Sequence, residues 1–378
     1  MANIARIPIT NVYAGGDYTG RILVGKAQKP MNVLLDTGSS ALALDAKKYK
    51  PSPAGGDKTT DLAQTDSYGD GSSWTGAVIT TELTVGTGST SVELSGGNAA
   101  IAYTASSDMF GETDGILGLA YAPLDDAFTM PSDTWKEQYS AVQVRSGKQG
   151  EIKPYLTQLA DAGTVSDKIS FVTRRSFIHA GGGNEKDPLN QGVMVVGGGE
   201  ESKDLYTGNF QTVKVLADDC YNTNLKAVIV GSADPIAARL KGPKGMPSNS
   251  IVDSGTNSLN LGPQMLKAML SKFSASQQAL LSTSIDGKLV SSADLKLSDW
   301  PTLTFILQGD VGDVSLKVVP SDYWQVNTEK VGAAMVAITK GDPGLAILGL
   351  PIMNGYFTIF DGEADGGRGV IKFATRAN

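Results

Sequence analysis

Short apolar runs, several of them rich in β-branched residues, recur along this chain of 378 residues. Gly, Pro, Asn, Asp and Ser separate the runs, which is typical of strands joined by turns in a mostly antiparallel fold. The pattern therefore predicts an all-β protein. The runs expected to form strands are 22–24, 31–35, 77–83, 168–173, 193–196, 213–216, 227–230, 303–307 and 357–360.

Two stretches, 154–162 and 263–273, space their apolar residues as a helix does. The first begins at Pro154 and is followed by Gly163, residue types that favour the start and the end of a helix. The second also begins with a proline, Pro263. Both stretches are expected to be packing helices without a role in the chemistry.

One motif occurs twice. Residues 33–40 read Val-Leu-Leu-Asp-Thr-Gly-Ser-Ser, and residues 250–257 read Ser-Ile-Val-Asp-Ser-Gly-Thr-Asn. Each copy is followed by an apolar-apolar-Gly unit, at 116–118 and 347–349. Two copies in the same order indicate a duplicated lobe.

The stretch 180–191, rich in Gly, Asn and Lys, lies between the two copies and is typical of a loop or linker. It predicts an N-terminal lobe, 1–180, and a C-terminal lobe, 181–378.

Composition narrows the possible chemistry. Apolar residues are 41% and charged residues 19%, as in a globular protein, and a net charge of −7 without a Lys/Arg run argues against a nucleic-acid partner. No apolar stretch approaches the length of a membrane span. The single histidine, His179, argues against Ser-His-Asp or Cys-His catalysis and His-rich metal sites. Carboxylates are therefore the expected catalytic groups, with no metal or other cofactor.

Each motif copy places an aspartate, Asp36 or Asp253, at the end of an apolar strand. The glycine two positions later allows close backbone approach, and the next hydroxyl residue, Ser39 or Thr256, can hydrogen-bond the carboxylate. A single Asp-hydroxyl-Gly triplet is explained equally well by a turn. The duplication is not, and two carboxylates that meet would share one proton.

With these motifs the chain resembles the pepsin-like, bilobal aspartic proteases from about residue 18 to 373. The resemblance implies two pseudo-twofold-related, β-rich lobes with a few short helices. Further segments that resemble the family are 18–22, 67–72 (a flap hairpin), 115–121, 168–172, 195–198, 206–208, 300–305 and 347–361.

The resemblance assigns roles by motif. Asp36 and Asp253 would be the catalytic pair, one ionised to activate water and one protonated to polarise a carbonyl, as is established for aspartic proteases. The residues implied to support the pair are Thr37, Ser39 and Ser254. Those implied to bind substrate are Gly38, Tyr68, Gly69, Asp70, Gly255, Thr256 and Asn257.

The implied activity is hydrolysis of peptide bonds in extended polypeptides at acid pH, inhibited by pepstatin-like compounds. A bulky apolar residue is expected before the cut bond. Asp70 in the flap is predicted to admit Lys there too, with a plain turn role as the equally weighted alternative. Because one chain carries both aspartates, a monomer is expected.

Three features depart from the family pattern. Ala43 stands where many relatives carry a Trp that anchors the flap tyrosine. Trp74 could replace it, although a surface aromatic of the hairpin is the preferred interpretation. With one cysteine, Cys220, and no prosegment ahead of Tyr13, the chain resembles the disulfide-free bacterial homologues of the shewasin type. That implies a cytoplasmic protein, or a secreted or periplasmic one if a signal peptide has been removed.

Two rival functions are weighed against the protease. Some members of the family are catalytically inactive binding or inhibitor proteins, but these usually lose an aspartate or distort the flap. A two-carboxylate glycosidase is the second rival, and it does not explain the duplicated Asp-hydroxyl-Gly units.

Overall fold

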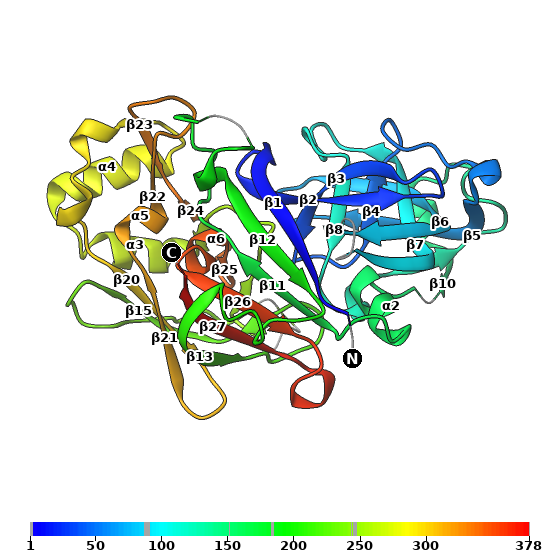
Figure 1. Ribbon diagram of the computed structural model, residues 1–378. Helices are drawn as coiled ribbons and strands as arrows, with labels where there is room; N and C mark the ends of the chain where they lie inside the picture. The colour runs from blue at the N-terminus through cyan, green and yellow to red at the C-terminus, as the bar shows by residue number, and fades with distance from the viewer. Residues whose placement is uncertain are drawn as a thin grey trace. The chain divides into compact units, whose positions relative to one another are not determined.

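The computed structural model describes residues 3–86, 91–150, 152–182, 185–242, 244 and 248–377. Strands predominate and the helices are short, which confirms the predicted all-β class (Figure 1). The chain forms two compact units. Unit 1 comprises Met1–Ile7, Thr19–Lys168 and Val195–Gly198, and unit 2 comprises Pro8–Tyr18, Ile169–Met194 and Gly199–Asn378. The lobe boundary expected at residue 180 stays a prediction, and Gly183 and Asn184 of the expected loop lie outside the described residues.

Unit 1 is built around a ring of strands. Strands β2, β3, β8, β4, β7 and β6 follow one another in hydrogen-bonded order, and β6 also pairs with β2, which closes the ring. The strands assigned mostly to this unit are β2 (Asp17–Val24), β3 (Lys29–Asp36), β4 (Leu42–Asp45), β5 (Lys58–Ser67), β6 (Ser73–Val85), β7 (Val92–Ala105), β8 (Gly115–Gly118), β9 (Ala127–Thr129) and β10 (Lys148–Gly150). Its helices are α1 (Ala141–Arg145) and α2 (Tyr155–Asp161).

The first copy of the repeated motif lies in three neighbouring strands of unit 1. Strand β3 runs parallel to β8, with Asp36 paired to Gly118, and β4 runs antiparallel to β8. A Cβ at Gly118 would lie 2.4 Å from the carbonyl carbon of Ser40, closer than atoms can approach. Only glycine therefore lets the loop after β3 pass this close to β8.

Unit 2 contains sheets of five, four and three strands and, in addition, six strands that pair in the order β1, β12, β11, β26, β27 and β13. The strands assigned mostly to it are β1 (Ala5–Ala14), β11 (Lys168–Val172), β12 (Gln191–Val196), β13 (Tyr206–Lys214), β14 (Asn222–Thr223), β15 (Leu225–Val230), β16 (Ile236–Ala237), β17 (Ser250–Val252), β18 (Leu259–Leu261), β19 (Val290–Ser291), β20 (Leu303–Gln308), β21 (Asp313–Val318), β22 (Trp324–Val326), β23 (Ala333–Val336), β24 (Ile338–Lys340), β25 (Ala346–Leu348), β26 (Tyr356–Asp361) and β27 (Val370–Arg376). Its helices are α3 (Pro263–Leu270), α4 (Ala275–Ile285), α5 (Pro320–Tyr323) and α6 (Leu350–Met353).

The second copy of the motif repeats the local arrangement of the first. Strand β17, which leads into Asp253, runs parallel to β25, and β18 runs antiparallel to β25. A Cβ at Gly349 would lie 2.1 Å from the carbonyl oxygen of Thr256. The glycine of each apolar-apolar-Gly motif thus allows the loop that follows the aspartate to pass close to the neighbouring strand.

The two predicted helices are present as α2 and α3. Gly163, with φ +68°, follows α2 in the left-handed conformation expected of a helix-ending glycine. The predicted strands are also found, although the run 213–216 is extended only as far as Lys214.

Four α-helices of the described residues were not anticipated from the spacing of apolar residues: the short α5 and α6, and also α1 and α4. The last two share a signal at their start. Both begin with a capping box, in which the serines Ser140 and Ser274 exchange hydrogen bonds with Gln143 and Gln277. That Ser-x-x-Gln pattern is the signal in the sequence that could have located them.

Candidate active site

Asp36 is the last residue of β3 and is buried, at 6% exposure. The backbone N–H of Gly38 donates to its Oδ1 at 2.8 Å, and the Ser39 hydroxyl donates to its Oδ2. The N–H of Leu119 donates to the Asp36 carbonyl at 2.7 Å, which ties the carboxylate-bearing residue to the chain that leaves β8. Both carboxylate oxygens thus have a donor, which fixes the orientation of the carboxylate.

Asp253 has the same surroundings in unit 2. It is 7% exposed and follows β17 directly. The N–H of Gly255 donates to Oδ1 at 2.9 Å, and the Thr256 hydroxyl donates to Oδ2 at 2.7 Å. Its own N–H donates to the Leu348 carbonyl of β25 at 3.1 Å. Each unit therefore builds one buried carboxylate with a glycine N–H and a hydroxyl as donors.

The remaining residues of the two loops divide into buried and accessible ones. Thr37 and Ser254, which follow the aspartates, are fully buried, whereas Gly38, Gly255 and Asn257 are only half-buried. The pairing of Asp36 with Asp253 remains a prediction, as do the roles of the neighbouring residues.

The expected hairpin lies between β5 and β6, whose antiparallel pairing places Ser67 opposite Ser73. The Tyr68 N–H donates to the Ser72 carbonyl at 2.9 Å, and Gly71, with φ +87°, turns the chain. Gly69 and Asp70 are exposed at the tip.

Asp70 has a definite place in this turn. Its Oδ1 accepts the Ser72 N–H at 2.8 Å, and the Ser72 hydroxyl and N–H lower the pKa of the Asp70 carboxyl. Asp70 is therefore charged and stabilises the tip, so the turn role that we weighed evenly against Lys binding is present.

The side chain of Tyr68 is held by Trp74. The Trp74 indole N–H donates to the Tyr68 hydroxyl at 3.2 Å, and Trp74 is 1% exposed. Our preferred interpretation of Trp74 as a surface aromatic of the hairpin was wrong.

The reason lies in the core that surrounds the indole. Trp74 packs in a cluster whose other buried members include four alanines, Ala41, Ala43, Ala100 and Ala102. Ala43 lies opposite Ala100 on β7 and Ile116 on β8, so the small side chain where relatives carry a Trp leaves room for an indole arriving from β6. The indole that bonds Tyr68 therefore comes from β6, and not from position 43 on β4.

The Tyr68 hydroxyl stays protonated. Burial raises the pKa of Tyr68 most, and the negative charges of Asp66 and Asp36 raise it further. Tyr68 thus feels the field of the Asp36 carboxylate within unit 1, and its hydroxyl is available as a neutral hydrogen-bonding group.

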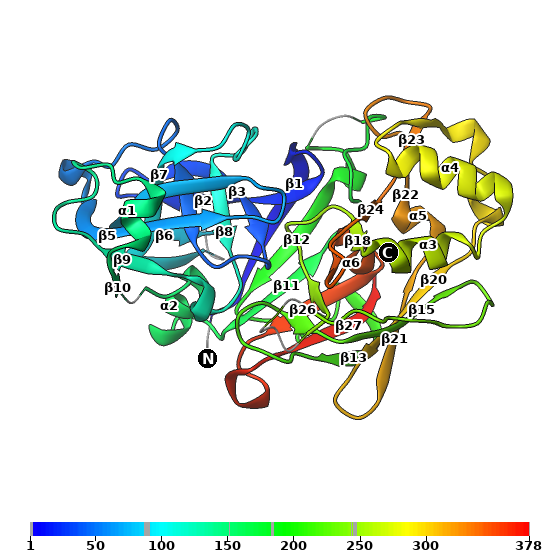
Figure 2. The same cartoon turned by 180° about the vertical axis from the view of Figure 1, so that it is seen from behind.

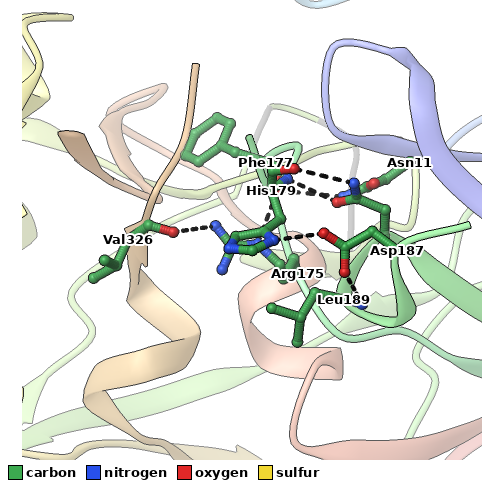
Figure 3. A network of polar contacts seen from close by, with 8 residues as sticks. Asn11, Arg175, Phe177, His179, Asp187, Leu189 and Val326 are labelled. Atoms are coloured by element: carbon green, nitrogen blue, oxygen red, sulfur yellow. Dashed lines mark hydrogen bonds and ion pairs between the residues drawn. The ribbon is translucent and has the colours of Figure 1, made fainter. Parts of the chain in front are cut away.

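A second polar network surrounds the single histidine in unit 2 (Figure 3). The Nδ1 atom of His179 lies 2.6 Å from Oδ2 of Asp187, whose Oδ1 accepts the Leu189 N–H at 3.0 Å. Nearby, the buried guanidinium of Arg175 donates to the carbonyls of Phe177 and Val326 at 3.2 and 2.7 Å. In the part of the chain that the structure describes, the His179 ring has no hydrogen bond to a serine or cysteine. The network therefore ties loops together.

Two properties of the described residues bear on other functions. Among them, no three His, Cys, Asp or Glu side chains are grouped as a metal site requires. No helix in this part of the chain is long and apolar enough to span a membrane.

The sequence is also similar to a known protein family and to several of its members. The family model described as "Eukaryotic aspartyl protease" matches residues 17–146 and 184–373. A gastricsin of Rattus norvegicus is 26% identical over 366 residues, covering 92% of this chain and 79% of the relative. A gastricsin of Oryctolagus cuniculus (24%, 92% and 80%) and rhizopuspepsin-2 of Rhizopus niveus (24%, 94% and 79%) are similar over comparable lengths.

The bond between Trp74 and Tyr68 can be tested by a double-mutant cycle. We expect Tyr68→Phe to lower the free energy of unfolding by about 0.5–1.5 kcal/mol. Trp74→Phe should lower it by more, because the smaller ring also leaves a cavity in the core. The double variant should lose less than the sum, because the same hydrogen bond is lost once. Urea unfolding measures all four proteins. Tyr68→Phe combined with Trp300→Phe, a tryptophan of unit 2, should be additive; additivity in the Trp74 pair as well would contradict the bond.

The His179 network predicts a pH-dependent stability. Burial raises the pKa of Asp187, but hydrogen bonds from the His179 ring and the Leu189 N–H outweigh burial and leave it lowered. A lowered carboxyl pKa stabilises the fold above the unfolded value, about 4, and that stabilisation is lost as pH falls through the folded value. Asp187→Asn should therefore be less stable by on the order of 1 kcal/mol at pH 6.

The difference between wild type and Asp187→Asn should shrink between pH 4 and pH 2 in urea unfolding. Asp161→Asn, which breaks the exposed pair with Lys153, serves as the control and should change stability little at any pH. A deficit in Asp187→Asn that is the same at pH 6 and pH 2 would show that the carboxylate charge plays no part.

Proposed function

We propose that this chain, which belongs to the eukaryotic aspartyl protease family, hydrolyses peptide bonds through Asp36 and Asp253 acting as one catalytic pair. Family membership makes it an aspartic-type endopeptidase with polypeptide substrates. The observation that carries the assignment of the pair is the repeated environment of the two carboxylates. Each is buried and accepts a glycine N–H and a side-chain hydroxyl.

In the proposed mechanism the pair holds one proton. The ionised aspartate takes a proton from a water molecule as the water oxygen attacks the carbonyl carbon, while the protonated aspartate donates its proton to the carbonyl oxygen. The resulting tetrahedral diol then collapses. One of its hydroxyls returns a proton to the aspartate that is now ionised, and the leaving nitrogen receives a proton from the aspartate that took one from water. Thr37 and Ser254 are proposed to brace the two loops, and Ser39 and Thr256 to orient the carboxylates.

Substrate is proposed to bind as an extended strand under the hairpin. Gly38, Gly69, Gly255 and Asn257 would supply main-chain or amide contacts, and Tyr68 would close over the peptide. Support comes from the hairpin itself, whose Tyr68 is fixed by Trp74 and lies in the field of Asp36. A bulky apolar residue before the cut bond and inhibition by pepstatin-like compounds belong to this proposal.

Neither carboxylate loop favours the inactive binding-protein alternative, because both aspartates retain their donors. The gastricsin and rhizopuspepsin relatives are vertebrate and fungal, so they give no support to the bacterial, cytoplasmic assignment. Cell fractionation would separate a cytoplasmic from a secreted or periplasmic protein.

We propose that the protein is a monomer, since one chain supplies both aspartates.

The catalytic pair is tested with an unfolded protein substrate between pH 3 and pH 7. We expect cleavage to peak at acid pH and to fall as both carboxylates ionise, and pepstatin to block it. Asp36→Asn and Asp253→Asn should each lose about 10²–10⁴-fold in rate while remaining folded. Asp108→Asn, at an exposed position, should keep full activity. A folded Asp36→Asn or Asp253→Asn variant with wild-type rate would contradict the assignment.

Selectivity at the hairpin tip is tested with two peptides that differ in the residue before the cut bond, Lys or Leu. If the Asp70 charge attracts Lys, Asp70→Asn should lower kcat/KM for the Lys peptide by about 5–10-fold and spare the Leu peptide. Asn retains the oxygen that accepts the Ser72 N–H, so the turn survives. Equal losses on both peptides, in Asp70→Asn and in Asp70→Ala, would leave Asp70 as a turn residue only.

A further inference from the structure

A cavity of about 370 Å³ opens in unit 1 beside the hairpin. It lies where β5 meets α1 and β9, which pack against β5 and are seen together in Figure 2. Its volume falls at the lower end of the range typical of ligand pockets, about 300–1,000 Å³. The lining residues that matter below are three apolar ones, Trp74, Leu124 and Phe128, and three charged ones, Asp66, Asp126 and Arg145.

Two lining residues of the cavity are hydrogen-bonded to residues near Asp36 or in the hairpin. Ala41 lines it, and the Ala41 carbonyl accepts the N–H of Gly118, the residue paired with Asp36. Trp74 lines it too, and its indole anchors Tyr68. Asp66 lies directly opposite Trp74 in the β5–β6 pairing. A peptide lying along this hairpin can therefore place one side chain in the cavity.

Two carboxylates and one cation line the cavity. Asp66 is partly buried, and burial raises its pKa although the Ser67 N–H and the charge of Arg145 oppose the rise. Asp126 is exposed at the rim. Asp125 is buried next to them, accepts the Gln64 amide at 2.6 Å, and its pKa is raised to about 7 by burial and then by the neighbouring carboxylates. Within the ranges described, no ion pair joins Arg145 to Asp66 or Asp126, although the charge of Arg145 acts on Asp66 and the Gln149 amide donates to Asp126 at 2.8 Å.

We propose that this cavity is a specificity pocket that takes the side chain of a Lys or Arg residue of the substrate. The aliphatic stem would pack on Leu124 and Phe128 while the cationic end meets Asp66 and Asp126. The inference rests on the proposed protease function and names one side chain of its substrate. The pocket is separate from Asp70, which does not line it.

The test begins with the cleavage sites of wild type in a mixture of denatured proteins, identified by mass spectrometry at the highest pH at which the enzyme still cleaves. We expect Lys and Arg to be enriched at one position relative to the cut bond. Two peptides then carry Lys or norleucine at that position, since norleucine keeps the stem and lacks the charge. Wild type should prefer the Lys peptide by about 5–10-fold in kcat/KM.

Two substitutions should lower this Lys/norleucine ratio and a third should raise it. Asp126→Asn and Asp66→Asn should bring the ratio towards one, while Arg145→Gln, which removes the competing cation, should raise it by about 2–5-fold. A general loss of packing would lower both rates and could not raise the ratio. Glu93→Gln, at an exposed position of β7 outside the cavity, is the matched loss of one negative charge and should leave the ratio unchanged.

The outcomes separate the two levels of the argument. Cleavage by wild type without enrichment of cationic residues, or with a ratio that the three cavity variants leave unchanged, overturns the pocket and leaves the protease intact. Absence of cleavage by folded wild type overturns the proposed function, and the pocket with it.

Discussion

The close approach of a loop to a glycine is the constraint on which both carboxylate sites depend. At Gly118 and Gly349 the neighbouring backbone atoms lie so near that a Cβ would meet them at 2.4 and 2.1 Å. Removing the side chain lets β8 or β25 pass directly beneath the loop that carries the aspartate. The parallel pairing β3–β8 and its counterpart β17–β25 then fix the position of each aspartate at the end of its strand.

The rest of the surroundings of each aspartate follows from that constraint. Since the strand before the aspartate is fixed by its neighbour, the loop turns at a set place, and the glycine N–H and the hydroxyl reach the carboxylate oxygens. Pre-positioned donors cost no reorganisation when charge on the carboxylate changes. The sequence repeat is therefore a repeat of backbone geometry around the two aspartates.

Local signals in the sequence predicted more of this than distant ones did. The motifs around Asp36 and Asp253 depend on residues within a few positions, so strand ends, the glycine approach and the donors could be anticipated. The indole of Trp74 could not be placed in the same way, because its burial depends on alanines contributed by β4 and β7. Helix α4 was missed because its apolar residues form no stripe, and its capping box is a weaker signal than periodicity.

The aspartates of this chain show how surroundings decide what a carboxylate does. Asp187, hydrogen-bonded to the His179 ring, has a lowered pKa and is a charged tie between loops. Asp125, with one amide donor and deep burial, has a pKa raised to about 7 and is largely neutral below that pH. Asp36 has two donors and neighbours a protonated tyrosine.

Residue type alone therefore assigns none of these roles. Asp36 and Asp187 both accept a hydrogen bond at each carboxylate oxygen, and what differs is the partner: a glycine N–H and a serine hydroxyl for Asp36, a backbone N–H and the His179 ring for Asp187. In a chain with one histidine, aspartates alone already span different proton affinities, because the backbone and core around each of them differ.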